Sequence, residues 1–315
     1  MFYSLGLLFV LDKLDDRKAV DARDSGGRYG ASTRIASSRD QKYARKGKRR
    51  AGESSVWYLF SRRAAAEIQA FNPEARILIM LREPAEMLYS LYYQFRFDGN
   101  EHLPTFEEAL AAEDDRRAGR RMTRQTYLAQ GLVYRDTARY TEQVGRYFDV
   151  FGRERVQVII YDDLVADVRG VYGRVLEFLG VDSTRIEADF QVINGNKSVR
   201  HSTLRALLND PLVRSTAVAV GRRLPRPFFA ALHDVDRRLW KFNSRSEKRP
   251  PLAPKVRAQL QREFAPEVER LSELLGRDLT YWSRQGLPVA EPLPSPLASF
   301  RLSRVPASAS CPQAK

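Results

Sequence analysis

Two apolar runs of strand length constrain the fold of this chain more than any other feature of its sequence. The first covers residues 77–81 and the second covers residues 156–161. Such runs are typical of strands that are buried on both faces of a parallel sheet. Because segments with helical patterns precede and follow each run, their order predicts an α/β fold, a parallel sheet flanked by helices.

The expected helices are bounded by residues that start or stop a helix. Asn72-Pro73 ends the helix before the first strand, because the residue before a proline avoids the helical conformation. Pro84 stands in the first turn of the next helix, where its missing N–H costs nothing. Gly152 and Gly180 end two later helices. The predicted helices are 62–71, 84–97, 106–122, 125–150, 168–180, 202–223 and 254–275, the last being one helix or a pair kinked at proline.

The two ends of the chain lack such patterns. Residues 1–11 are apolar but have no basic start and no cleavage site, so they are expected to form a buried strand or helix fragment rather than a signal peptide. Residues 12–50 are polar and charged, and the C-terminal segment is rich in proline. The expected organisation is a poorly ordered or aberrant segment over 1–51, a folded domain over 52–284 and a disordered tail over 285–315.

The charge of the chain indicates an anionic partner. It has 53 Lys and Arg against 39 Asp and Glu, a net charge of +14 and a pI near 10.0. This favours nucleic acid, an anionic membrane or a small molecule carrying phosphate or sulfate. A general bias of the composition towards arginine explains the charge equally simply, because the arginines are spread through nearly every segment.

Several kinds of site are not expected. No apolar run approaches the length of a membrane helix. No segment combines basic residues with the stacking aromatics that a nucleic-acid interface needs. Three widely separated histidines and one cysteine predict neither a metal site nor a disulfide.

The segment after the first strand carries the residues that best suit a phosphate. Arg82 ends the strand and Ser90 lies about two turns into the next helix. Ligands of open α/β sheets bind beyond the C-terminal ends of the strands. An arginine fork, a hydroxyl and the N–H groups of a helix N-terminus can together bind a phosphate there. The spacing equally allows Arg82 to pair with Glu83 or Glu86 at the surface.

The pattern R-x-P-x-E-x-x-x-S after an apolar strand resembles the 3′-phosphate-binding motif of the sulfotransferases that use 3′-phosphoadenosine 5′-phosphosulfate (PAPS). Other segments resemble the family in the same order, and the last resembles its bacterial and heparan-sulfate-type branch. These segments are GESSVWYL at 52–59, FEEALAAE at 106–113, VQVIIYDDL at 156–164 and FAPEVERLSELLGRDLTYW at 264–282.

The resemblance implies a P-loop-type α/β domain that transfers a sulfuryl group from PAPS to a hydroxyl of a carbohydrate or glycolipid, without a metal. The arginine–serine pair would hold the 3′-phosphate of the donor. The family also implies Glu53 as the general base, although the residue alone suggests a surface acid or a helix cap. Tyr161 would line the nucleotide site, unless it is a core tyrosine. Lys197 and Arg200 would belong to a basic loop that closes over the donor.

One element of the family is not found in the sequence. The family begins with a strand and a Gly-x-x-Lys-x-Gly-Thr-Thr loop that binds the 5′-phosphosulfate. The nearest string, GGRYGAST at 26–33, has Tyr29 in place of the lysine and follows no apolar strand. The first strand and the phosphate loop are therefore expected to be missing, as in a truncated or frame-shifted chain, and transfer is expected to be impaired.

The alternative is a non-catalytic protein that binds a nucleotide or an anionic polymer. A phosphotransferase is less well supported, because the sequence has no lysine-bearing phosphate loop. The resemblance to the bacterial branch and the lack of paired cysteines together predict a cytoplasmic protein of bacterial type.

Overall fold

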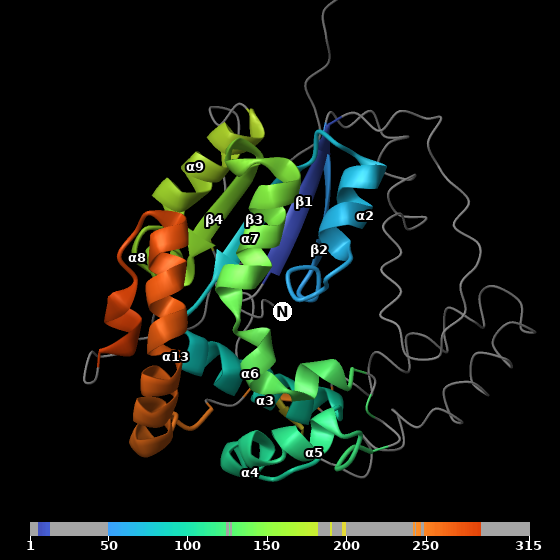
Figure 1. Cartoon of the computed structure of the whole chain (residues 1–315), viewed down its shortest axis with the longest axis vertical. Coiled ribbons are helices and arrows are strands. Elements are labelled where there is room, and N and C mark those ends of the chain that lie inside the picture. The colour runs from blue at the N-terminus through green and yellow to red at the C-terminus, as the bar shows by residue number, and fades with distance from the viewer. Residues whose placement is uncertain are drawn as a thin grey trace, which may run out of the picture.

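A computed structural model of the chain describes residues 6–12, 50–123, 126, 128–181, 190, 197–199, 242, 244–246 and 249–284. At its centre is a four-stranded sheet with the strand order β2-β1-β3-β4 (Figure 1). Its strands are β1 (Gly6–Asp12), β2 (Arg50–Ser55), β3 (Arg76–Leu81) and β4 (Val156–Ile160). A second sheet pairs two short strands, β5 (Lys197–Val199) and β6 (Ser244–Ser246).

The two apolar runs that predict the sheet form its parallel part, where β3 and β4 pair side by side. β1 lies between β2 and β3 and is antiparallel to both, so the prediction of a wholly parallel sheet is wrong for this strand. Its formation confirms one of the two alternatives expected for residues 1–11, a strand. Apolar composition predicts burial, but a strand can hydrogen-bond to its neighbours in either direction, so composition does not set the direction. The GGRYGAST string at 26–33 lies outside the described residues.

Most of the predicted helices are confirmed, but two are divided. The helix expected over 106–122 is broken at Ala112 and ends at Arg117. The stretch expected over 125–150 is broken at Val133 and at Arg139, whose backbones are both non-helical. The helix expected over 202–223 lies outside the described residues. The α-helices are α2 (Ala64–Phe71), α3 (Pro84–Asp98), α4 (Phe106–Ala111), α5 (Glu113–Arg117), α6 (Tyr134–Thr137), α7 (Tyr140–Phe151), α8 (Tyr161–Ala166), α9 (Val168–Leu179) and α13 (Pro254–Leu275).

Short 3-10 helices join some of these elements: η1 (Gln130–Leu132), η2 (Arg153–Arg155) and η4 (Thr280–Ser283). α13 is continuous, with Pro266 inside it, so of the two alternatives for this segment the single helix is confirmed. None of the described helices combines the length and the hydropathy that crossing a bilayer would require.

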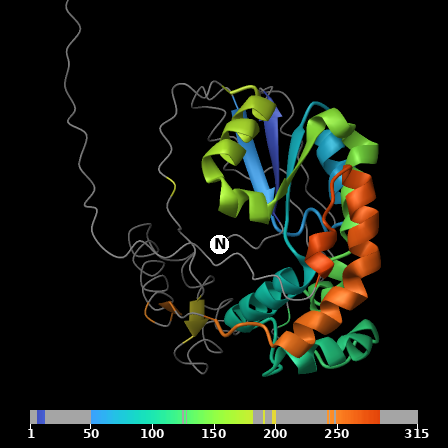
Figure 2. The same ribbon diagram turned by 90° about the vertical axis from the view of Figure 1, so that its left-hand side faces the viewer.

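The helices cover both faces of the sheet, and alternate residues of β3 contact opposite layers. Ile77, Ile79 and Leu81 join the main core, which also contains buried residues of α2, α7 and α13. Leu78 faces the other way and packs with Leu179 of α9. Figure 2 shows α9 on one side of the sheet and α13 on the other. This two-sided burial is what the uninterrupted apolar run of β3 predicts.

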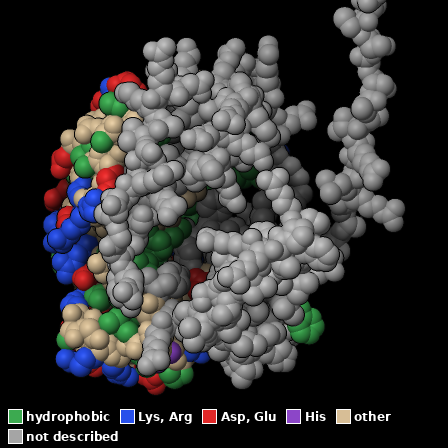
Figure 3. All heavy atoms as spheres, turned by 90° about the vertical axis from the view of Figure 1, so that its right-hand side faces the viewer, with side chains coloured by type: hydrophobic (Ala, Val, Ile, Leu, Met, Phe, Trp, Pro, Cys, Tyr) green, Lys and Arg blue, Asp and Glu red, His purple; other side chains and the backbone are tan. Residues whose placement is uncertain are grey.

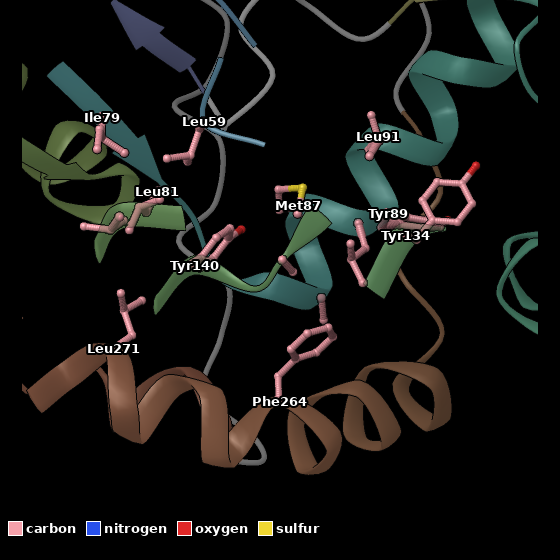
Figure 4. Close-up of a cluster of buried hydrophobic side chains, with 14 of the residues drawn as sticks. Leu59, Ile79, Leu81, Met87, Tyr89, Leu91, Tyr134, Tyr140, Phe264 and Leu271 are labelled. Carbon is pink, nitrogen blue, oxygen red and sulfur yellow. The ribbon is translucent and has the colours of Figure 1, made fainter. Parts of the chain in front are cut away.

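The main core continues beyond the sheet towards α3 and α13 (Figure 4). Tyr140 of α7 and Met87 of α3 lie between the end of β3 and α13, which contributes Phe264 and Leu271. Helix α13 therefore contacts both α7 and α3. This packing brings the start of α13 close to the segment that follows β3, although the two are far apart in the sequence.

A buried ion pair lies among the helices beyond the sheet. The side chains of Glu101 and Arg116 are both 0% exposed, and Arg116 Nη2 is 2.8 Å from Glu101 Oε1. The hydroxyl of Tyr134 donates to Glu101 Oε2 at 2.8 Å, and Arg116 Nη1 donates to the carbonyl oxygen of Leu132 at 3.1 Å. Removing either partner would leave the other charge buried without compensation.

Candidate functional site

Arg82 and Tyr161 lie side by side at the C-terminal edge of the sheet. β3 and β4 end in register, with Leu81 opposite Ile160, so the next residue of each strand lies at the same level. The guanidinium carbon of Arg82 is 4.8 Å from the centre of the Tyr161 ring, which is within cation–π range. The structure thus brings together two of the residues that the sequence assigns to one nucleotide site.

The backbone of Arg82 is held by α7. The hydroxyl of Tyr140 donates to the carbonyl oxygen of Arg82 at 3.1 Å. Tyr140 is completely buried, and burial raises the pKa of its hydroxyl well above the usual value, so the group remains a donor. The side chain of Arg82 is 16% exposed. It is therefore supported by the protein but still accessible from solvent.

Arg82 is one of three arginines that surround the carboxylate of Glu86; we call these four residues the arginine cluster. Arg82 Nη2 is 3.1 Å and Arg249 Nη2 is 2.9 Å from Glu86 Oε2, while Arg257 Nη2 binds Glu86 Oε1. The alternative in which Arg82 pairs with Glu86 is thus correct, but the pair is largely buried rather than at the surface. Arg82 therefore pairs with Glu86 and contacts Tyr161 at the same time.

The arginine cluster has more positive than negative charge within the described residues. Three guanidinium groups surround the single carboxylate of Glu86, and a second acid, Glu83, lies 3.7 Å from Arg257 Nη1. Burial raises the pKa of Glu83 to about 7, so this acid is only partly ionised near neutral pH. Arginine forks beside a hydroxyl-bearing helix are a donor set that suits a phosphate.

Other arginines of the described residues are balanced by acids at the surface. Exposed pairs include Arg117 with Asp114 and Arg120 with Asp115. Figure 3 shows blue basic and red acidic side chains interleaved along the visible edge of the described part. Such exposed pairs contribute little to stability or specific binding, so the net charge of the chain does not by itself identify a site.

Glu83 caps α3 and changes what its N-terminus can bind. Its Oε2 accepts the backbone N–H of Glu86 at 2.7 Å, and Pro84 at the first helical position has no N–H. The sequence predicts that N–H groups here are open to a phosphate. For the N–H of Glu86 this is wrong, because the cap residue already satisfies it. The anion-binding capacity of this edge therefore depends mainly on the arginines.

The raised pKa of Glu83 predicts that stability falls as the pH rises. Between pH 4.5 and about 7 the folded protein keeps a proton on Glu83 that the unfolded chain has lost, and folding is penalised progressively over this interval. One pKa unit is about 1.4 kcal/mol, so the full effect is on the order of 3 kcal/mol. The Glu83→Gln variant keeps a capping oxygen but cannot ionise. We expect its stability relative to the unmodified chain to rise by about this amount between pH 5 and pH 8 in urea unfolding.

Glu67→Gln is the matched control, because Glu67 is a more exposed acid paired with Arg63 on α2. Because exposed i,i+4 pairs contribute little to stability, this variant should differ from the unmodified chain by at most about 0.5 kcal/mol throughout the range. A constant difference for Glu83→Gln as well would show that Glu83 does not keep its proton in the folded protein.

Ser90 follows the arginine cluster along α3. It is one turn beyond Glu86, so the two share a helix face, and it is partly buried. Its hydroxyl makes no hydrogen bond to any other residue that the structure describes. The backbone of β5, which begins at Lys197, packs against α3. The segment that the sequence assigns to a donor-closing loop thus lies near the helix that carries Ser90, and Arg200 lies outside the described residues.

Glu53 lies in β2, away from Arg82 and Tyr161. Glu53 and Ile77 both pair with Phe9 of β1, so they are two strand spacings apart, about 10 Å. Arg82 is five residues further along β3, about 17 Å. The two backbones are therefore separated by roughly 20 Å, and the structure does not bring Glu53 into the group formed by Arg82, Tyr161 and the α3 helix.

The acids that follow β4 have structural partners. Asp162 accepts hydrogen bonds from the Tyr281 hydroxyl at 3.0 Å and from Trp282 Nε1 at 2.8 Å. Asp163 pairs with Arg277 through both of its oxygens. These contacts join α8 to the segment that follows α13. No group of acids, histidines or cysteines in the described part of the chain is arranged to hold a metal ion.

Sequence reasoning missed two members of the arginine cluster, Arg249 and Arg257. Arg249 precedes a Pro-Pro pair, a local context without a distinctive signal. Arg257 does carry a signal, because it shares a face of α13 with the buried residues Leu260 and Phe264 at helical spacing. A charged residue on the buried face of a helix implies a buried partner, and that partner is Glu86.

Comparison with known proteins identifies the family. The Sulfotransferase domain family matches residues 42–220, more than half of the chain. Among solved structures, the sulfotransferase from Alicyclobacillus acidocaldarius is 27% identical to this chain, with a TM-score of 0.48. The match covers 73% of this chain and 66% of that one, so the chain spans slightly less than two thirds of that protein's length. Comparison with curated proteins finds no match. The family match covers β2, β3, β4 and the whole of α3, and the chain belongs to the sulfotransferase domain family.

Proposed function

We propose that this protein binds PAPS and transfers its sulfuryl group to a hydroxyl of an acceptor, with a carbohydrate or glycolipid as the acceptor class. The observation that carries this proposal is the position of Arg82: it lies at the C-terminal edge of β3, beside Tyr161 and directly before α3, the helix that contains Ser90. Ligands of α/β sheets bind at this edge. Membership of the sulfotransferase family supports the reaction type.

The residues of this edge fit the 3′-phosphate of the donor. Arg82 supplies a charged fork and Ser90 supplies a hydroxyl. The excess of guanidinium over carboxylate groups in the arginine cluster supports an anionic ligand. Tyr161 offers an aromatic face next to Arg82 for the nucleotide. Lys197, which begins the β5 strand near α3, is proposed to contact the phosphates together with Arg200.

PAPS, when bound, supplies the activated sulfuryl group. The chain's own part in the chemistry is to orient the donor and to take the proton of the acceptor hydroxyl as that oxygen attacks sulfur. We assign the role of general base, which takes this proton, to Glu53, following the family resemblance. Transfer by this chain is proposed to be impaired, because its sequence contains no Gly-x-x-Lys-x-Gly-Thr-Thr loop to bind the 5′-phosphosulfate.

The proposed contact of Arg82 and Ser90 with the 3′-phosphate, here called the clamp, predicts selective binding of a 3′-phosphate. The full chain should bind adenosine 3′,5′-bisphosphate more tightly than adenosine 5′-monophosphate in calorimetry. Arg82→Ala should remove much of this preference, because a hydrogen bond to a charged group contributes about 1.5–3 kcal/mol, which is roughly ten- to a hundredfold in affinity. The variant should lose affinity for the bisphosphate, while its affinity for the monophosphate should change little.

Arg76→Ala is the matched control. Arg76 lies at the opposite end of the same strand, with its guanidinium carbon 5.7 Å from the Phe178 ring, so its loss should not change the preference. Equal affinity of the unmodified chain for the two nucleotides would contradict the clamp. Selective binding without any transfer activity, even after a phosphate loop is supplied, would favour the non-catalytic nucleotide-binding alternative.

A further inference from the structure

Glu86 is the point at which the end of β3 meets the distant start of α13. It lies in the first turn of α3, and its side chain is only 9% exposed. Arg82 reaches it from the end of β3, Arg249 from the segment before α13, and Arg257 from the first turn of α13. Both oxygens of its carboxylate pair with arginine side chains. A carboxylate shared by three guanidinium groups fixes the positions of all of them relative to α3.

We propose that Glu86 is a positioning residue for donor binding: it orients the guanidinium of Arg82 beside Tyr161, and Arg249 and Arg257 hold Glu86 in place. The inference rests on the proposed function, because it concerns how Arg82 is presented to a 3′-phosphate. The inference adds Glu86, Arg249 and Arg257 to the residues that support 3′-phosphate binding, and all three act through Arg82.

The geometry favours a positioning role for Glu86, because the guanidinium of Arg82 contacts both the Tyr161 ring and the Glu86 carboxylate. The Tyr161 ring lies on one side of its guanidinium at 4.8 Å, and Glu86 Oε2 is 3.1 Å from its Nη2. An arginine side chain has many rotamers in solution, and holding it in one of them before the ligand arrives lowers the entropic cost of binding. The Tyr140 bond to the Arg82 carbonyl fixes the backbone from which this side chain extends.

A carboxylate beside Arg82 could instead compete with the phosphate for it. The other two arginines oppose this effect, since Arg249 and Arg257 bind the same carboxylate and offset its charge. Arg249 is itself held, with its guanidinium carbon 5.0 Å from the Tyr89 ring. The hydroxyl of Tyr89 donates to the carbonyl oxygen of Pro250 at 3.2 Å. Glu86 is thus fixed independently of Arg82 and can remain in place when a phosphate contacts that arginine.

The test measures the preference for adenosine 3′,5′-bisphosphate over adenosine 5′-monophosphate by calorimetry on the full chain. Glu86→Gln keeps the size of the side chain but removes its charge, and it should lower the preference about tenfold, within the range of coupling between residues in direct contact. Glu142→Gln is the matched control, because Glu142 also pairs with an arginine one turn away but is exposed on α7. It should leave the preference unchanged.

A double-mutant cycle separates positioning from general damage to the site. If Glu86 acts through Arg82, Glu86→Gln should have no further effect on the preference in the Arg82→Ala background. A purely structural role would lower the affinity for both nucleotides together and leave their ratio unchanged. Additive losses of the preference in the double variant would overturn the inference.

The outcomes also distinguish this inference from the proposed function. No preference in the unmodified chain would overturn both. A preference that depends on Arg82 but is unchanged or increased in Glu86→Gln would overturn only the role of Glu86, and an increase would identify it as a competitor. If Glu86→Gln does not fold, Arg257→Lys, which keeps the charge but not the fork, should reduce the preference by about two- to threefold. An unchanged preference in that variant would overturn the inference.

Discussion

Arg116→Met is expected to destabilise the protein by about 3–5 kcal/mol, because it leaves the fully buried carboxylate of Glu101 without its charged partner. Domains of ordinary stability unfold at a cost of about 5–15 kcal/mol, so the loss removes a large fraction of the total. The two backbone N–H groups of His102 and Leu103 and the Tyr134 hydroxyl would still bind Glu101, but none of them carries a charge. Urea unfolding followed by circular dichroism measures the effect.

The neighbouring residue provides a matched control. Arg117 is 43% exposed and pairs with Asp114 and Asp136. Its third partner, Glu113, is 3.9 Å away and keeps a closer pair with Arg135 at 3.1 Å, so Arg117→Met should cost at most about 1 kcal/mol. The double variant Arg116→Met with Glu101→Gln should recover part of the loss, since no uncompensated charge remains. If Arg116→Met and Arg117→Met were equally mild, the buried pair would not be important for stability.

Transfer from PAPS by the 315-residue chain is expected to be very weak, because no loop is present to stabilise the charge that develops on the leaving phosphate. One such donor contributes about a hundred- to a thousandfold to the rate. A chain with a strand and a Gly-x-x-Lys-x-Gly-Thr-Thr loop added ahead of it should therefore gain at least this factor. A radiolabelled-sulfate assay with a panel of glycosides and glycolipids measures the gain.

The chain with the restored loop also tests the base. Glu53→Gln in that background should lower the rate by about a hundred- to ten-thousandfold, which is the usual contribution of a general base. Glu67→Gln, an acid on α2 that pairs with Arg63, should have no effect. Rapid turnover by the unmodified chain would contradict the proposed impairment. Restored activity that is indifferent to Glu53→Gln would contradict the assignment of the base.

The pH dependence of Glu83 and the proposed positioning by Glu86 concern the same helix end but different properties. Glu83 lies at the cap of α3, and its titration changes the stability of the fold. Glu86 contacts Arg82, and its substitution is expected to change the preference for a 3′-phosphate. Comparing unfolding and nucleotide binding for both variants therefore separates a stability effect from a binding effect at neighbouring residues.

The sequence by itself determined the two strands that carry the site and the helix that follows the first of them. The apolar runs of β3 and β4 have the length of buried strands, and Glu83-Pro84 marks the start of α3. These features depend on local chemistry: side-chain burial, the fixed φ of proline and the capping of exposed N–H groups. The contact between Arg82 and Tyr161, in contrast, depends on the in-register pairing of β3 with β4.

Only the tertiary structure decided the direction of β1 and the partners of Glu86. An apolar strand can pair in either direction, so the position of β1 depends on the edges that its neighbours offer. Arg249 and Arg257 lie more than 160 residues beyond Glu86, in a chain where arginine occurs in nearly every segment. Which of them meet a buried carboxylate depends on how α13 packs against α3 and α7, and no local pattern encodes that long-range geometry.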